Sequence, residues 1–296
     1  MKTNARLRLA VSVGFALVVG LVVSVGTGVE AQPGEVDWSA VRLSTHHVAG
    51  TVHYLEGRGG NIGLSIGEDG VVMIDDQYGP LADRIRETIG GISNGNIRFL
   101  INTHVHGDHT GGNENFAAMG VPIVAQDRVR ARLAASRPDA ALPTLTFSEG
   151  ITLYLNGDPA HVIPMPAGHT DGDSIIHFVE SDVVHTGDMF RTVAFRVIDR
   201  NNGGTLDGTI EALGLLAGMA GPDTKILPGH GVVSGRADVI EFRDMVITVS
   251  ERVEALVAQG RSYDEVAAAD PTREYRDKWG DPERFLTAVY AELGGE

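Results

Sequence analysis

Four side chains that can bind a metal ion occur within six consecutive positions, in the pattern His-x-His-x-Asp-His. They are His104, His106, Asp108 and His109. In a tight loop that contains a glycine, all four can converge on one point. A purely structural role would require hydrogen-bond partners for three imidazoles and a carboxylate within a single turn, which is rare. The pattern therefore indicates a metal site.

Three more potential ligands share a common setting, because each follows an apolar run and lies beside glycine. They are His169, Asp188 and His230. A single His or Asp in a loop is more often a capping or solvated group, so each of them is weak evidence alone. The chain has no cysteine, so the site must be built from imidazole and carboxylate. Such a ligand set suits zinc, manganese or iron, and zinc is the metal we expect.

The first cluster follows an apolar run that is typical of a strand, at residues 97–101, and precedes a predicted helix at 113–119. The turn at 67–70 predicts a hairpin. Residues 136–147 resemble a linker between two similar halves. We therefore predict two sheets packed face to face with helices outside. The other predicted strands are 52–55, 62–66, 71–74, 121–125, 151–155, 161–164, 174–179, 182–186 and 225–227, and the other predicted helices begin near Pro80 and span 127–135, 207–219 and 236–258.

With these residues in order, residues 61–230 resemble the metallo-β-lactamase superfamily. The resemblance implies a mixed α/β fold, the four-layer αββα sandwich, with the metal ions between the sheets. It also assigns the ligands. One ion takes His104, His106 and His169, the other takes Asp108, His109 and His230, and Asp188 bridges them.

The reaction that the resemblance implies is hydrolysis of an amide, lactone, ester or thioester bond, by a hydroxide bridged between two zinc ions. Two such ions lower the pKa of a water to about 7, and Asp108 would accept a hydrogen bond from the hydroxide. Asp188 stands where the best-known β-lactamases have a thiolate, and a carboxylate bridge instead resembles the glyoxalase II, lactonase and related branches. Hydrolysis of β-lactams stays open, because other lactamases of the family also lack the thiolate. Asp75 resembles an early aspartate that hydrogen-bonds the metal loop, although it also suits a strand-end cap.

Two other functions stay open at this point. One is a sulfur dioxygenase with a single iron, and the other is a binding protein with structural metal. Asp108, His109 and His230 together favour two ions, and the many glycines beside the ligands favour an open site.

Outside the ligand set, a long loop at residues 190–204 follows Asp188 and is expected to pass close to the metals. Its Arg191, Phe195 and Arg196 are candidate substrate contacts, because guanidinium binds carboxylate in a bidentate fork. The remaining histidines are expected to be structural or to lie near the mouth of the site. They are His161, His177 and His185 in strands, and His46, His47 and His53 before the matched region.

Charge and composition define the partners that suit the chain. Lys and Arg number 24 against 39 Asp and Glu, a net charge of −15. That field repels phosphate backbones and anionic lipids, which disfavours nucleic acid. We therefore expect a small-molecule substrate. Residues 32–296 are long and apolar enough for one domain, with a C-terminal helical segment at 236–296, and no feature indicates the oligomeric state.

Residues 1–31 resemble a secretory signal peptide, because three basic residues precede the apolar stretch 9–25 and small residues end at Ala31. The exported chain would begin at Gln32 in the periplasm, with no stable membrane association. Retention as an anchor is the alternative, since about 17 apolar residues lie near the lower limit for spanning a bilayer.

Overall fold

The computed structural model describes residues 36–294, and the predicted signal segment lies outside this range. From Trp38 onward, the described residues form one compact unit. Within the described part of the chain, no helix is both long and apolar enough to cross a membrane.

The first half of this unit forms a seven-stranded sheet in which the strands follow one another in chain order. Strands β1 to β4 are antiparallel, and β4 to β7 are parallel. The predicted hairpin is confirmed as β3 and β4, which pair Gly67 with Gly70. The strands are β1 (Ser44–Ala49), β2 (Val52–Glu56), β3 (Ile62–Gly67), β4 (Gly70–Ile74), β5 (Ile97–Ile101), β6 (Ile123–Gln126) and β7 (Leu145–Phe147).

The second half forms a five-stranded sheet in the order β12-β11-β10-β9-β8. Strands β8 to β11 are antiparallel to their neighbours, whereas β12 joins β11 in parallel. Helix α5 (Leu206–Met219) supplies the connection that a parallel pair requires. The strands are β8 (Ile151–Leu153), β9 (Ala160–Pro164), β10 (Ser174–Phe178), β11 (Val183–His185) and β12 (Lys225–Leu227).

The two sheets pack on each other because their central strands are apolar on both faces. In β4, Val72 belongs to the core between the sheets, whereas Met73 belongs to the core beneath the outer helices. This division follows from the twofold alternation of side chains along a strand. The core between the sheets also contains Ile176 and Phe178 of β10.

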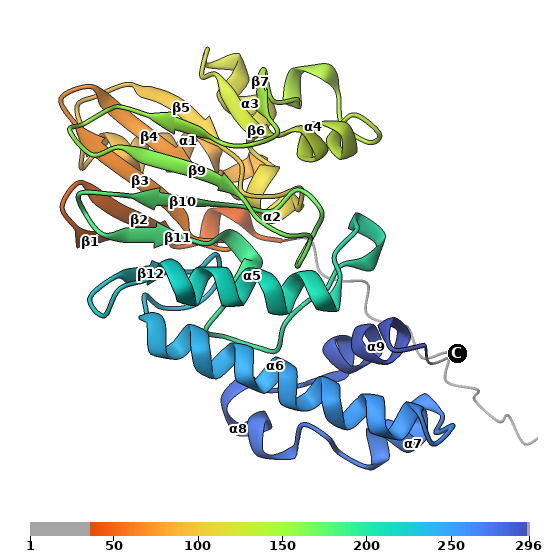
Figure 1. Cartoon of the computed structure of the whole chain (residues 1–296). Helices are drawn as coiled ribbons and strands as arrows, with labels where there is room; N and C mark the ends of the chain where they lie inside the picture. Colours follow the sequence, from red (N-terminus) through yellow and green to blue (C-terminus); the bar gives the residue numbers. More distant parts are fainter. Residues whose placement is uncertain (1–35, 295–296) are drawn as a thin grey trace, which may run out of the picture. The chain divides into compact units, whose positions relative to one another are not determined.

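Helices cover the outer face of each sheet. Buried residues of α1 (Ala82–Gly90) and α3 (Asn113–Ala118) share a core with the first sheet. Residues of α5 and α6 (Arg236–Val257) share a core with the second sheet, and Figure 1 shows these two helices side by side. The predicted αββα sandwich is therefore confirmed.

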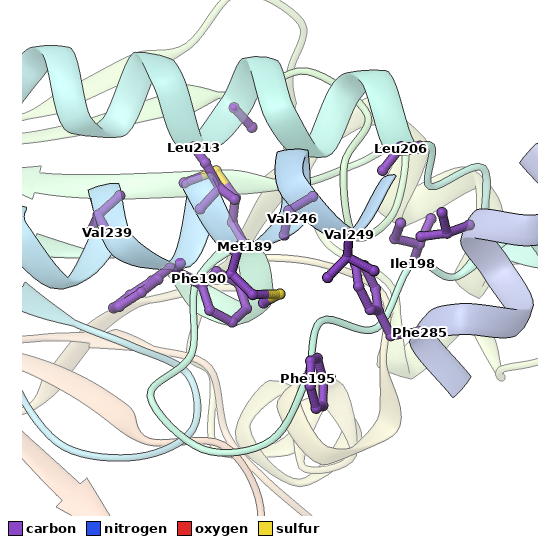
Figure 2. Close-up of a cluster of buried hydrophobic side chains, with 14 of the residues drawn as sticks. Met189, Phe190, Phe195, Ile198, Leu206, Leu213, Val239, Val246, Val249 and Phe285 are labelled. Atoms are coloured by element: carbon purple, nitrogen blue, oxygen red, sulfur yellow. The ribbon is translucent and has the colours of Figure 1, made fainter. Parts of the chain in front are cut away.

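The C-terminal helices complete the outer layer of the second sheet. They are α7 (Tyr263–Ala268), α8 (Arg276–Trp279) and α9 (Glu283–Glu292). Phe285 and Trp279 bury their rings against the loop that follows β11. Figure 2 shows the resulting cluster, in which side chains from this loop, α5, α6 and α9 meet.

One expectation about the elements was wrong, and one strand was not predicted. Residues 136–147 are not simply a linker, because 145–147 form the edge strand β7, paired with β6. The sequence pattern also missed β1. Both are edge strands with mostly exposed or half-buried residues, so they lack the apolar alternation that marks a strand. The helix connecting β6 to β7, α4, spans Asp127–Leu133.

Candidate metal centre

Every predicted ligand lies just beyond the carboxyl end of a strand. The loop after β5 and the short helix α2 (Gly107–Thr110) carry the first cluster of four ligands. His169 follows β9, Asp188 follows β11 and His230 follows β12. Because the sheets are packed face to face, these segments meet at one edge of the sandwich. They form two separate groups of three potential ligands and a third group, His104, His109 and Asp188, that shares one histidine with each of the other two.

The first group consists of His104, His106 and His169. The Nδ1 atom of His106 lies 3.1 Å from Nε2 of His104 and 2.8 Å from Nε2 of His169. His104 and His169 are buried, whereas His106 is partly exposed. Three imidazole nitrogens thus converge on one point that remains open toward solvent on one side.

The second group consists of Asp108, His109 and His230. The Nε2 atom of His230 lies 3.1 Å from Oδ2 of Asp108 and 3.4 Å from Nε2 of His109. Two imidazoles and a carboxylate therefore converge on a second point.

Asp188 lies between the two groups. Its Oδ1 is 3.3 Å from Nε2 of His109 and 3.4 Å from Nε2 of His230, whereas its Oδ2 is 3.7 Å from Nε2 of His169. One oxygen thus faces each group. Oδ1 is buried and accepts no hydrogen bond from the described residues, which is costly for a carboxylate unless a cation is its partner.

The outer nitrogens of three ligands identify which nitrogen carries the proton. Nε2 of His106 donates to Asp199 at 2.7 Å, Nδ1 of His169 donates to a main-chain oxygen at 2.7 Å, and Nδ1 of His109 donates to Asp75 at 2.7 Å. Carboxylate and carbonyl oxygens only accept. In the neutral rings the inner nitrogens therefore present lone pairs, and those of His106 and His169 are only 2.8 Å apart. A cation between them removes their repulsion, so these residues fit a metal.

Burial and charge give the ligands the protonation states that a metal requires. Burial lowers the pKa of His169 to about 3 and holds the pKa of His104 well below its usual range, so both rings are neutral. Burial alone would raise the pKa of Asp108, but a hydrogen bond from His230 and the charge of His109 lower it to about 2. This carboxyl is therefore ionised.

His109 has the opposite balance. Burial would lower its pKa, but Asp75 and Asp188 together raise the pKa of His109 well above its usual range. Two buried carboxylates thus create a negative potential at this ring, which favours a cation there, whether a proton or a metal ion.

Asp75 is hydrogen-bonded to both groups of ligands, to His109 directly and to His104 through Thr103. Its carboxylate accepts hydrogen bonds from the Thr103 main-chain nitrogen at 2.7 Å, from Thr103 Oγ1 at 2.8 Å and from His109. Thr103 Oγ1 in turn lies 2.9 Å from Nδ1 of His104. One buried carboxylate therefore orients an imidazole in each group, as the early aspartate was expected to do.

Three polar residues that the sequence did not single out also hold the ligand loops. Asp199 accepts from His106, and Asp173 accepts from the main-chain nitrogen of His169 at 2.7 Å. Asn61 donates to the main-chain oxygens on either side of Gly229 and His230, those of Pro228 and Gly231. Each is an isolated polar residue in a loop and belongs to no motif. Its role can therefore be seen only from its position next to a ligand loop in the structure.

The loop after Asp188 does not present its candidates as expected. Phe195 is 3% exposed and stacks on Phe285, and Arg196 is 0% exposed. Their side chains are therefore core residues, and the structure does not bring them to the mouth of the site. Arg191 is different, because it is 14% exposed and its Nη2 lies 3.3 Å from Oδ2 of Asp188.

The other histidines lie outside the three donor groups found among residues 36–294. His185 is buried, and its Nε2 hydrogen-bonds the main-chain oxygen of Asn61 at 3.0 Å. His161 and His177 face each other across β9 and β10. The other three lie at one end of the first sheet, His46 and His47 on the edge strand β1 and His53 on its neighbour β2.

The comparison with known sequences agrees with this geometry. The model of the metallo-beta-lactamase superfamily matches residues 55–230. A hydroxyacylglutathione hydrolase of Rhodospirillum rubrum is 32% identical over 179 residues, which cover 58% of this chain and 61% of that protein. One from Cereibacter sphaeroides is 30% identical over 175 residues, which cover 58% of this chain and 60% of that protein. The chain thus spans about three fifths of the length of these curated relatives.

Solved structures show the same fold. A metallo-beta-lactamase from Pontibacter korlensis has a TM-score of 0.61 at 16% identity, covering 69% of this chain and 99% of its own. The sec-alkylsulfatase Pisa1 from Pseudomonas sp. has a TM-score of 0.70 at 15% identity, covering 86% of this chain and 50% of its own. At these identities the likeness concerns the fold alone.

Proposed function

Because the chain belongs to the metallo-beta-lactamase superfamily, we propose that it is a hydrolase with a centre for two metal ions. The observation that carries the proposal is the position of Asp188, which turns one carboxylate oxygen toward each group of three ligands. A single ion would use only one of these groups. This second donor set favours hydrolysis over the single-iron dioxygenase alternative.

The residues assigned to the centre would hold zinc, with manganese or iron as the other metals that imidazole and carboxylate accept. His104, His106 and His169 would hold one ion, and Asp108, His109 and His230 the other. When bound, two such ions supply Lewis acidity, which activates a water and polarises a carbonyl.

Asp108 is the residue that we propose to orient the attacking water. Its carboxyl is 27% exposed, whereas that of Asp188 is only 7% exposed. Since the pKa of Asp108 is lowered to about 2, its carboxylate is ready to accept a hydrogen bond from the attacking water and so to orient it. We assign Asp108 this catalytic role in addition to metal binding.

The substrate class follows from the chemistry of such a site and from its relatives. Amide, lactone, ester and thioester bonds all present a carbonyl to an activated water. The likeness to hydroxyacylglutathione hydrolases makes thioesters the first compounds to assay. The β-lactams come second, since the solved lactamases share the fold alone.

The test is a metal count on the purified chain and on Asp188→Ala. We expect two equivalents of zinc in the unmodified chain and the loss of at least one in the variant, because a methyl group coordinates no metal. Hydrolysis should fall with the metal. His177→Ala is the matched control, since this histidine lies in β10 away from the donor groups. Two equivalents of zinc in both variants would contradict the assignment of Asp188, and one iron in the unmodified chain would favour the dioxygenase.

A further inference from the structure

A completely buried guanidinium lies directly behind the proposed centre. Arg196 is 0% exposed. Burial lowers the pKa of Arg196 to about 10, so it is still charged at neutral pH. Among the described residues, no carboxylate forms an ion pair with it, and both Nε and Nη2 lack a hydrogen-bond partner. Burying a charged guanidinium with incomplete hydrogen bonding and no ion pair lowers the stability of the fold, which suggests that the charge has a function.

The contacts of Arg196 reach two of the segments that carry ligands. Its Nη1 donates to the main-chain oxygens of Asp188 and Met189. Its Nη2 lies 3.2 Å from the position that a Cβ on Gly168 would occupy, beside the ligand His169. The guanidinium therefore fills the junction between the Asp188 segment and the His169 segment.

The residues that follow Arg196 contact two of the ligands, His169 and His106. The main-chain oxygen of Val197 accepts from Nδ1 of His169, and the carboxylate of Asp199 accepts from Nε2 of His106. Residues 196–199 thus contact three ligand-bearing segments in turn, and we call them the ligand strap.

The outer helices anchor the strap. Phe195 stacks on Phe285 of α9 with ring centroids 5.8 Å apart, and Ile198 is buried in the same core. Figure 2 shows Phe195, Ile198 and Phe285 in this cluster, together with Val249 of α6. The strap is therefore held by packing that is independent of the metal ligands.

We propose that Arg196 is a positioning residue that holds Asp188 in its bridging orientation. The inference rests on the proposed two-ion centre and assigns a cause to its geometry. By holding two consecutive carbonyls, the planar guanidinium limits rotation of the Asp188 segment. The same cation interacts electrostatically with Asp188 and with Asp173. Burial raises the pKa of Asp173, and the charge of Arg196 opposes this rise.

Arginine suits this position better than lysine. A guanidinium presents several N–H groups in a fixed plane and can reach two oxygens at once, whereas an ammonium is a single point of charge on a flexible stem. Arg196→Lys should therefore keep the charge and lose part of the positioning. Arg196→Met keeps most of the volume and loses both.

Titration of the metal-free chain with cobalt or zinc tests the role. We expect Arg196→Met to bind its tighter equivalent as the unmodified chain does and to bind the second at least tenfold more weakly, with Arg196→Lys intermediate. The visible spectrum and the electron spin resonance of the cobalt forms should lose the signature of two bridged ions. Neither readout depends on activity.

Arg243→Met is the matched control, because this guanidinium also packs against a glycine of the outer layer, Gly214, with a buried and unpartnered Nε. It should bind two equivalents normally.

If both Arg196 variants bind two equivalents with unchanged affinity and spectrum, Arg196 only fills space and the inference is wrong. If Arg196→Met does not fold, Arg196→Lys decides in the same way. A single equivalent in the unmodified chain would instead contradict the two-ion centre itself and, with it, the inference.

Discussion

At the scale of single residues, two imidazoles of the first group donate hydrogen bonds to acceptors of different kinds, through the ring nitrogen that faces away from the metal position. His106 donates to a carboxylate, Asp199, whereas His169 donates to the main-chain oxygen of Val197. A carboxylate behind an imidazole raises its basicity more than a neutral carbonyl does. His106, which is partly exposed, therefore has the stronger hydrogen-bond acceptor. The higher basicity of its ring helps it to compete with water for a metal ion.

Arg191 is the residue for which substrate charge can be tested. If its guanidinium holds an anionic group of the substrate beside Asp188, Arg191→Ala should raise KM for anionic esters or thioesters about tenfold or more and spare neutral ones, since a charge-assisted contact contributes roughly 1.5 to 3 kcal/mol. Steady-state kinetics on paired substrates measures this. Arg200→Ala is the control, because that arginine belongs to the same loop and pairs with Glu292. If Arg191→Ala loses the same activity on anionic and neutral substrates, Arg191 does not bind the substrate's anionic group and only pairs with Asp188.

At the scale of elements, the site depends on the turns at strand ends more than on the strands. Gly187 joins β11 to Asp188 with φ of +50°, and a Cβ there would lie 2.5 Å from Thr103 Oγ1. Thr103 is also the residue through which Asp75 orients His104. The turn after β11 and the loop after β5 are therefore packed against each other with no spare room.

Gly187→Ala should disturb both loops. We expect the free energy of unfolding to fall by about 1–3 kcal/mol and zinc retention to fall with it, because the new methyl group must displace Thr103 or change the turn. Denaturant titration and metal counting measure the two effects. Gly218→Ala in α5, where a Cβ meets open space, should instead be neutral or stabilising by up to about 1 kcal/mol. A Gly187 variant as stable as that control would contradict this description of the turn.

At the scale of the whole molecule, the proposed metal centre lies between the two sheets. It takes ligands from loops of the seven-stranded sheet and of the five-stranded sheet. Ions bound there would link the two halves of the sandwich. They would also offset the repulsion among the carboxylates and nitrogen lone pairs that the ligands bring together. Removal of metal is therefore expected to affect stability as well as activity.

Chelation provides the measurement. An ion present at about 100 times its dissociation constant stabilises the folded state by about 2.7 kcal/mol. For a chain of this size that corresponds to a fall in Tm of about 5–10 °C on treatment with a chelator, reversed by zinc. His177→Ala, with its ligands intact, should show the same fall. A Tm that does not respond to the chelator would mean that metal binding and folding are not coupled.

Export is the second property of the whole chain to be tested. The apolar stretch and the small residues before Gln32 predict cleavage after Ala31. Mass spectrometry of the periplasmic fraction should then show a chain that begins at Gln32. Recovery of a chain with its first residue intact from that fraction would remove the signal-peptide interpretation.

The sequence by itself determined the sandwich class, most helices and interior strands, and which residues are candidate ligands, because these depend on residue type, local spacing and apolar periodicity. The hairpin of β3 and β4 and the cluster from His104 to His109 are both readable in this way. For Asp75 the sequence left two roles open, a strand-end cap and a partner of the metal loop, and its hydrogen bonds with Thr103 and His109 favour the second.

Tertiary structure alone decided what lies around the ligands. The sequence placed Phe195 and Arg196 near the substrate, yet α9 and the core beneath it bury the first, and the Asp188 and His169 segments enclose the second. Asp199 was one acid among many until the fold placed it against His106. The physical reason is that burial and hydrogen bonding depend on elements that are distant in sequence, whereas residue type and period are local.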